Sequence, residues 1–232
     1  MLKQRLRRWR GAWNRRIAGA IDWGSLRSFE PVDRYWGSKR GLPVDRWYID
    51  EFLARHRDDM HGVVLESGHS EYSERFGKAV TRREVIHRTA SNRRATIVGD
   101  LVADGTLPAD TFDCVLLTQT LQYVTSPERA LLNCHRALKQ GGILLLSVPC
   151  ISLISPDDRQ ESGEYWRFTS QGVGLLLAEV FGASNVQVEV RGNLVATTAF
   201  LHGLAAEELT SEELARSDPH CELLVLARAV RP

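Results

Sequence analysis

Short apolar runs alternate with amphipathic segments from about residue 45 to the end of the chain. The apolar runs are rich in Val, Ile and Leu and are bounded by turn residues, which is typical of strands. Strands are predicted at residues 63–65, 84–87, 95–98, 113–118, 143–148, 186–190 and 222–229. Apolar residues at helical spacing predict helices at 45–57, 126–138 and 169–181, an element starting at 73–78, and a helical stretch over 194–214.

Two of these helices carry end signals. Ser126 is a predicted N-cap and is followed by Pro127 at the first helical position. The pair Gly141-Gly142 predicts the end of the same helix. Thr169 or Ser170 is the predicted cap of the later helix.

Strands that alternate with helices are typical of a mostly parallel sheet with helices on both faces. We therefore expect an α/β, Rossmann-like, doubly wound fold around a seven-stranded sheet. Sheets of this kind bind ligands at the carboxyl ends of their strands, near the point where the strand order reverses. This expectation places the site in the loops that follow residues 65, 87, 100, 118 and 148.

Composition narrows the class of protein. The chain has 232 residues, 43% of them hydrophobic and 25% charged, with a formal net charge of +1. These values are ordinary for a soluble globular domain and give no sign of a nucleic-acid partner. No window reaches the roughly 18 apolar residues of a membrane span. The four cysteines show no CxxC spacing, which favours free thiols and a cytoplasmic location.

The amino-terminal region differs from the rest of the chain. Residues 1–21 contain seven Lys and Arg side chains, no acidic one, and a stripe of apolar residues three or four positions apart. This pattern predicts an amphipathic helix that lies in a membrane interface, or one that packs against the protein or a partner. Residues 22–44 form an irregular arm that could cover the site. We therefore divide the chain into residues 1–44 and a domain at 45–232.

The segment FDCVLLTQTLQYVTSPERALLNCHRALKQGGILLLSVP, at 112–149, resembles the second half of a class I S-adenosylmethionine-dependent methyltransferase domain. Asp100-Leu101, followed by Leu107-Pro108, is similar to the third-strand loop of that family. The segment GEYWRFT, at 163–169, resembles a subgroup of small bacterial methyltransferase-like proteins found alongside glycosyltransferases and polysaccharide enzymes. The resemblance implies S-adenosylmethionine as the cofactor.

The resemblance also implies which residues hold the cofactor. The family's first loop carries a Glu followed by three alternating glycines, whereas residues 66–72 read ESGHSEY, with Ser70 and Tyr72 at glycine positions. Glycines there let backbone N–H groups approach a ligand. His87 stands where the family carries an acid for the ribose hydroxyls, and Asp100 matches the residue that meets the adenine amino group. The implied cofactor-binding residues are Glu66, Ser67, Gly68, Ser70, His87, Asp100, Leu101 and Gln119.

Methyl transfer mostly requires alignment of the nucleophile, and a general base helps a hydroxyl acceptor. His69 is the first candidate for that base and His202 the second, with a structural role as the alternative for each. Aromatic side chains stack on sugar rings, and Arg binds anionic groups. The predicted substrate-binding residues are Tyr35, Trp36, Tyr72, Tyr165, Trp166 and Arg167, with Arg46 as a further lid residue. No metal is expected, because no His, Asp and Glu cluster has ligand spacing.

The sequence thus favours S-adenosylmethionine-dependent O-methylation of a saccharide or another small acceptor, with possible membrane contact through residues 1–21. One alternative is a methyltransferase-like fold that has lost methyl transfer and binds another ligand. A second alternative is a protein that docks on a partner through its amino-terminal helix.

Overall fold

The computed structural model describes Gly24 and residues 27–155 and 163–232. A compact unit runs from Val32 to Pro232 and contains every helix and strand discussed below. The predicted basic helix at 1–21 lies outside the described residues. In the described part of the chain, no helix is long and apolar enough to cross a membrane.

Seven strands form one sheet in the order β3-β2-β1-β4-β5-β7-β6. Six of them run in the same direction, and β7 is antiparallel to both of its neighbours, β5 and β6. The predicted seven-stranded, mostly parallel sheet is therefore confirmed. The strands are β1 (Gly62–Ser67), β2 (Val80–His87), β3 (Ile97–Val98), β4 (Phe112–Thr118), β5 (Leu138–Pro149), β6 (Val186–Arg191) and β7 (Leu224–Val230).

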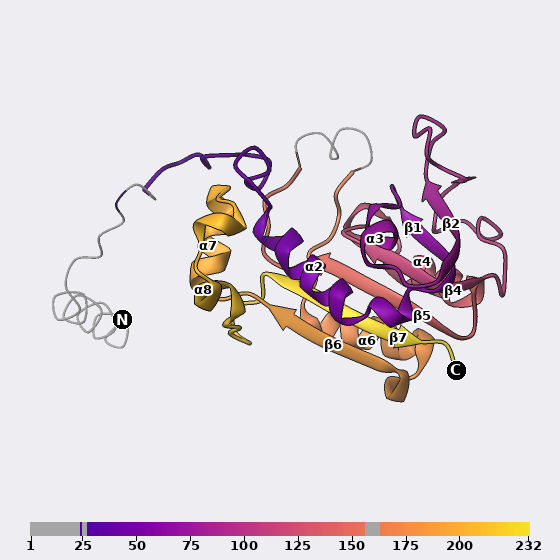
Figure 1. Cartoon of the computed structure of the whole chain (residues 1–232). Helices are drawn as coiled ribbons and strands as arrows, with labels where there is room; N and C mark the ends of the chain where they lie inside the picture. Colours follow the sequence, from indigo (N-terminus) through magenta and orange to yellow (C-terminus); the bar gives the residue numbers. More distant parts are fainter. Residues whose placement is uncertain (1–23, 25–26, 156–162) are drawn as a thin grey trace, which may run out of the picture. The chain divides into compact units, whose positions relative to one another are not determined.

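Helices cover both faces of the sheet, as predicted (Figure 1). Side chains on β4 alternate between the two sides: Val115 and Leu117 pack in one core with α4 and α6, while Cys114 and Leu116 pack in another with α2 and α7. This alternation is why a strand buried on both faces reads as a continuous apolar run. The helices are α2 (Val44–Arg55), α3 (Glu71–Phe76), α4 (Pro127–Ala137), α6 (Ser170–Phe181), α7 (Leu194–His202) and α8 (Ser211–Ala215).

The start of β5 differs from the prediction. Ser126 and Pro127 begin α4 and the helix ends at Ala137, within one residue of the predicted end, but β5 begins at once with Leu138 and not at residue 143. Leu138 pairs with Phe112 of β4, and the register then shifts before Ile143. The two glycines lie in that irregular stretch, where Gly141 has φ +77°. The two glycines therefore lie inside β5, at its irregular start, where this strand pairs with β4.

The stretch 194–214 is also divided, because Gly203 adopts the left-handed conformation and ends α7. The arm lies against this corner: the Val32 amide donates to the His202 carbonyl, and Pro43 forms a bridge with Ala205. Arg40 pairs with Glu208 next to it. The arm at 32–43 is therefore fixed to the segment at 202–208.

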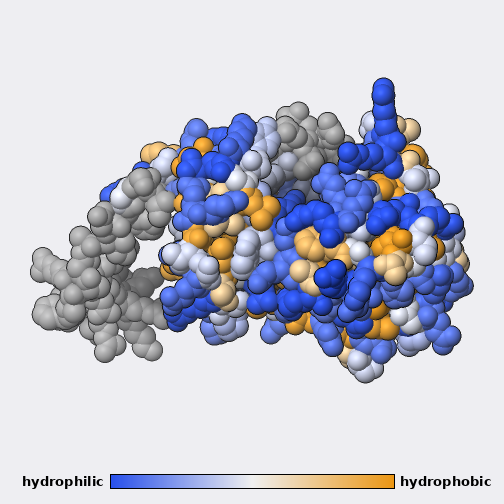
Figure 2. All heavy atoms as spheres, viewed as in Figure 1, coloured by the Kyte–Doolittle hydropathy of each residue, from blue (hydrophilic) through white to orange (hydrophobic). Residues whose placement is uncertain are grey.

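The viewed surface in Figure 2 is mainly hydrophilic, with apolar residues in separate patches.

All four cysteines are free thiols, and Cys114 and Cys134 are buried. Burial raises the pKa of the Cys134 thiol to about 12, so this thiol stays protonated at neutral pH. The predicted free thiols are thus confirmed.

Candidate functional site

A cavity of about 430 Å³ opens at the carboxyl ends of β1, β2 and β4, the edge of the sheet that the strand pattern predicted. Six of the eight predicted cofactor residues line it: Ser67, Gly68, His87, Asp100, Leu101 and Gln119. His69 and Tyr72 line it as well. The first loop and the turns after β2, β3 and β4 therefore meet around one space large enough for a small-molecule ligand.

Glu66 and Ser70 do not line this cavity. Glu66 is fully buried, and its carboxylate accepts hydrogen bonds from the backbone N–H groups of Tyr72, at 3.1 Å, and Ser73, at 3.0 Å. Ser70 donates its hydroxyl to Glu74 at the surface. Glu66 thus holds the amino-terminal turn of α3 against the end of β1, which places the first loop without touching a ligand.

This arrangement explains how the loop forms with a single glycine. Gly68 has φ +82°, a conformation that other residues rarely adopt. Ser70 has φ −113°, and Tyr72 already belongs to α3. Because α3 begins at Glu71, the backbone requires no glycine at positions 70 and 72.

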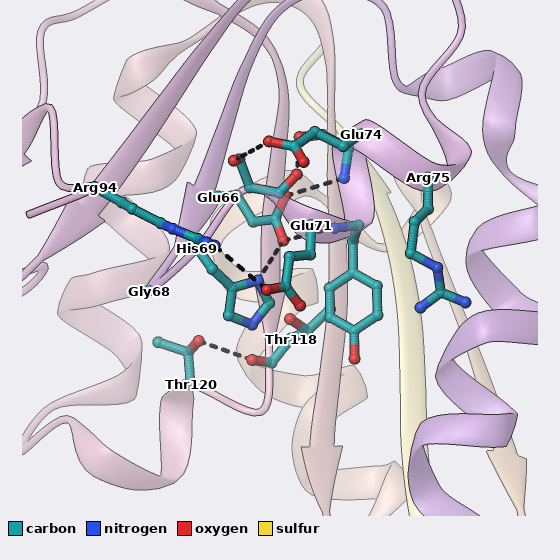
Figure 3. Close-up of polar contacts among 12 residues, drawn as sticks. Glu66, Gly68, His69, Glu71, Glu74, Arg75, Arg94, Thr118 and Thr120 are labelled. Atoms are coloured by element: carbon teal, nitrogen blue, oxygen red, sulfur yellow. Dashed lines mark hydrogen bonds and ion pairs between the residues drawn. The ribbon is translucent and has the colours of Figure 1, made fainter. Parts of the chain in front are cut away.

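His69 forms an ion pair with the buried carboxylate of Glu66. Its Nδ1 lies 3.1 Å from Oε1 of Glu66, and its ring lines the cavity (Figure 3). The interaction with the Glu66 carboxylate raises the pKa of His69 above its ordinary value, although burial acts in the opposite direction. A protonated His69 presents a cation to the cavity, beside the Arg46 guanidinium that also lines it.

The raised pKa of His69 predicts a pH-dependent contribution to stability. The protonated ring binds Glu66 more tightly in the folded state, so this stabilisation is complete below the unfolded pKa of about 6.5 and is lost as pH rises through the higher folded value. Thermal unfolding of the wild type and of His69→Gln should therefore differ most in acid and converge as pH rises. A difference in Tm that stays constant across this range would contradict the ion pair.

The turn after β2 presents basic and hydroxyl groups to the cavity. His87, Arg88, Thr89 and Ser91 line this side, and Nδ1 of His87 lies 2.9 Å from the Thr89 carbonyl oxygen. Among the described residues that line the cavity, Asp100 is the single carboxylate. The ribose acid that the family carries is thus replaced at this position by groups that can still hydrogen-bond to hydroxyls.

Asp100 and Leu101 lie on the opposite side, after β3. One oxygen of Asp100 accepts the backbone N–H of Val102 at 3.0 Å, which fixes the carboxylate at the cavity wall. Asn133 of α4 donates to the Leu101 carbonyl at 2.8 Å and anchors the same turn. This wall therefore offers a fixed hydrogen-bond acceptor next to an apolar side chain.

A second cavity, of about 240 Å³, shares Arg46, Gln119 and Tyr123 with the first. Gln119 has φ +48°, which is strained for a residue with a side chain and is typical of functional sites. The remaining residues of this cavity are Tyr35, Trp36, Ser38, Pro43, Asp45, Gln122, Pro149, Ser152, Glu164 and Phe200. Among the described residues, Arg46, Gln119 and Tyr123 thus lie where the two cavities adjoin.

The other predicted substrate residues divide between this cavity and the surface. Tyr35 and Trp36 line it, as a covering arm would. Tyr165, Trp166 and Arg167 line neither cavity; the Trp166 indole donates to the Val124 carbonyl, and Arg167 pairs with Glu164, which does line the space. His202 ends α7 away from both cavities, so the structure does not bring it near His69.

Sequence reasoning missed Asp45 and Gln122. Asp45 was assigned only as the start of a helix, and Gln122 had no assigned role. The signal for Gln122 was its place in TQTLQY, directly after the fourth strand. No local pattern marks Asp45, whose neighbours in the cavity come from distant parts of the chain.

Residues 68–146 match the family model described as "Methyltransferase domain". An S-adenosylmethionine-dependent methyltransferase from Mesorhizobium loti aligns with a TM-score of 0.53 at 18% identity, over 78% of this chain and 96% of that one. A putative methyltransferase from Bacillus halodurans aligns with a TM-score of 0.51 at 12% identity, over 79% of this chain and 98% of that one. This is the class I methyltransferase fold.

The methyltransferase fold is shared by proteins with different functions. Phosphoethanolamine N-methyltransferase 2 from Haemonchus contortus, solved with S-adenosyl-L-methionine, aligns with a TM-score of 0.53 at 12% identity, over 90% of this chain and 55% of that one. No curated protein matches the chain. The family match begins at Gly68, within the first loop, ends within β5, and supports a methyltransferase.

Proposed function

We propose that the protein is an S-adenosylmethionine-dependent methyltransferase that methylates a hydroxyl group of a small, saccharide-like acceptor. The observation that carries this proposal is the pair of adjoining cavities with Arg46, Gln119 and Tyr123 as their common wall. A methyl transfer needs two ligands bound side by side with their reacting atoms aligned.

The residues of the larger cavity fit the cofactor. Asp100 offers a carboxylate acceptor to an adenine amino group, and Thr89 and Ser91 offer hydroxyls near the end of β2 for a ribose. His69 and Arg46 supply positive charge for a carboxylate. When bound, S-adenosylmethionine supplies an electrophilic methyl group on a sulfonium. The contribution of this chain is therefore to hold both ligands, to exclude water between them and to accept a proton.

Titration calorimetry with S-adenosylmethionine and S-adenosylhomocysteine tests the proposal. Micromolar binding of both is the expected result. Failure of both to bind at millimolar concentration would overturn the proposed cofactor.

The second candidate, a methyltransferase fold that binds another ligand, is favoured by the basic turn His87-Arg88, which replaces the ribose acid. The fold accommodates other chemistry, since the [4+2]-cyclase SpnF aligns with a TM-score of 0.52 at 16% identity, over 88% of this chain and 87% of that one.

Asp100→Ala is expected to weaken cofactor binding about tenfold to a hundredfold. A hydrogen bond to a charged group contributes about 1.5–3 kcal/mol, and about 1.4 kcal/mol corresponds to a factor of ten in Kd. Asp104→Ala is the matched control, because Asp104 lies in the same loop but pairs with Arg129 at the surface. Equal Kd values for the two variants would remove Asp100 from the cofactor site.

A further inference from the structure

We propose that the 240 Å³ cavity is the acceptor site, that it takes a neutral pyranose-like ring, and that Asp45 accepts the proton of the hydroxyl that is methylated. The source of the methyl group rests on the proposed function above. The ligand class of the cavity and the role of Asp45 rest on contacts within the cavity itself.

Gln122 provides an unused hydrogen-bond acceptor in this cavity. Its side chain lines the space and the residue is only 3% exposed. Its Nε2 donates to Oε1 of Gln119 at 3.0 Å, whereas its own Oε1 is buried without a partner among the described residues. A buried polar atom without a partner costs about 1–3 kcal/mol. A ligand that donates a hydroxyl group to this atom would remove that cost.

Asp45 provides the second acceptor and is held in a fixed orientation. Its Oδ2 accepts from the Arg46 guanidinium at 2.9 Å and from Nε2 of Gln119 at 3.3 Å. Gln122, Gln119 and Asp45 therefore form one chain of hydrogen bonds along the cavity wall. This chain orients the carboxylate toward the boundary with the cofactor cavity, since Gln119 and Arg46 line both spaces.

The environment of Asp45 suits a proton acceptor. Burial raises the pKa of its carboxyl group, which the positive charge of Arg46 partly opposes. The other titratable groups near Arg46 are His69, Tyr72 and Tyr123, which line the larger cavity, and Asp50, which lies on α2 and pairs with Arg75. A carboxylate with a raised pKa holds a proton better near neutral pH and is a more effective general base.

The charges and rings of the cavity favour a neutral, hydroxylated ligand. Each lining carboxylate already has a cation: Arg46 pairs with Asp45, and Arg167 pairs with Glu164 at 2.6 Å. Among the described residues, the cavity lining therefore offers no uncompensated charge to an ammonium or carboxylate ligand. Trp36 is fixed by a hydrogen bond from its indole to Ser152 at 3.2 Å, so it presents a rigid aromatic face. Such a face stacks on the C–H groups of a sugar ring, while Oε1 of Gln122 and the Asp45 carboxylate accept hydrogen bonds from its hydroxyls.

The proposed methyl transfer moves one proton to Asp45 and leaves one electron pair on sulfur. The acceptor hydroxyl gives its proton to the Asp45 carboxylate, and its oxygen forms a bond to the methyl carbon. The bond between that carbon and the sulfonium sulfur breaks, and its electron pair remains on sulfur, which leaves a neutral thioether. Asp45 then returns the proton to water when the product leaves.

The test uses the full chain, with and without S-adenosylhomocysteine, and a panel of methyl pyranosides with gluco, galacto and manno configurations. Saturation-transfer NMR measures binding of each glycoside, and S-adenosylmethionine with a ¹³C-labelled methyl group reports methyl transfer. The variants are Asp45→Asn, which keeps the shape of the side chain, and Gln122→Met, which removes the unused acceptor. Asp50→Asn is the matched control, because Asp50 lies on the same helix outside both cavities.

We expect at least one glycoside to bind and to be methylated. Asp45→Asn should lower the methylation rate about 100-fold with cofactor affinity unchanged, since a general base contributes about 10²–10⁴-fold. Gln122→Met should weaken glycoside binding about tenfold, and Asp50→Asn should match the wild type in both measurements.

Two results would overturn the inference. If no glycoside gives saturation transfer in the presence or in the absence of S-adenosylhomocysteine, the cavity is not a pyranose site. If Asp45→Asn methylates as fast as the wild type, Asp45 is not the base. Failure of the cofactor alone to bind is a separate outcome: it removes the proposed function, and the glycoside titration of the free protein still decides the ligand class of the cavity.

Discussion

Glu66→Ala is expected to lower the free energy of unfolding by about 2–6 kcal/mol and to abolish binding of S-adenosylmethionine. Glu66 is fully buried and accepts two backbone N–H groups at the start of α3. Each buried donor left without a partner costs about 1–3 kcal/mol. Cofactor binding should be lost because Ser67, Gly68 and His69 keep their positions only while α3 is held against β1.

Chemical denaturation and titration calorimetry measure the two effects of Glu66→Ala. Glu74→Ala is the control, since Glu74 lies on α3 and interacts with the Ser70 hydroxyl at the surface. Glu66→Gln should give a smaller loss, because the amide retains one acceptor oxygen. Cofactor binding by Glu66→Ala at the wild-type affinity would show that the first loop holds its shape without this carboxylate.

Gly203→Ala is expected to release the arm at 32–43 and to cost about 2–5 kcal/mol. A Cβ at this position would lie 1.9 Å from the Asp33 carbonyl oxygen, and φ is +73°. The left-handed conformation costs about 1–2 kcal/mol for a residue with a side chain, and overpacking adds about 1–3 kcal/mol. Because Tyr35 and Trp36 lie on this arm, the smaller cavity should lose a wall while the larger cavity keeps its lining.

Limited trypsin digestion at Arg34, Lys39 and Arg40 measures release of the arm, and calorimetry measures retention of the cofactor. Gly105→Ala is the matched control, since Gly105 has φ +78° and a Cβ there would meet no atom within 4 Å. Both variants incur the conformational cost, but Gly203→Ala alone introduces the collision. Equal digestion rates for the two variants would show that the arm does not depend on this close approach.

The fold could be predicted because its signals are local. The run at 113–118 is apolar at successive positions because Cys114 and Leu116 enter one core while Val115 and Leu117 enter the other. The start of β5 at Leu138, ahead of the predicted start at residue 143, could not be predicted in this way. The strand pairing of Leu138 with Phe112 is a long-range contact that no local pattern marks.

The cofactor cavity could be predicted to the extent that it follows from strand ends. Ser67, His87, Asp100 and Gln119 end or follow parallel strands, so topology alone brings them together. Glu66 is the exception, because its side chain turns inward to bind backbone groups of α3. A resemblance that assigns roles by position cannot distinguish an inward side chain from an outward one.

The smaller cavity was largely hidden from the sequence because its contacts are not local. Asp45 and Gln119 are 74 positions apart, and their hydrogen bond forms only after α2 packs on the sheet. Tyr35 and Trp36 were found because an aromatic-rich arm before a domain is a recognisable feature. Asp45 lacked any such mark.

The common wall of the two cavities also bears on inhibitor design. In the part of the chain that the structure describes, Arg46, Gln119 and Tyr123 alone line both spaces, so a short tether passing these side chains would join a thioether nucleoside in one to a sugar ring in the other. Once one end is bound, the other end is present at a high effective concentration. A single bisubstrate molecule could therefore exploit contacts that neither fragment makes alone, and its selectivity would come from the smaller cavity.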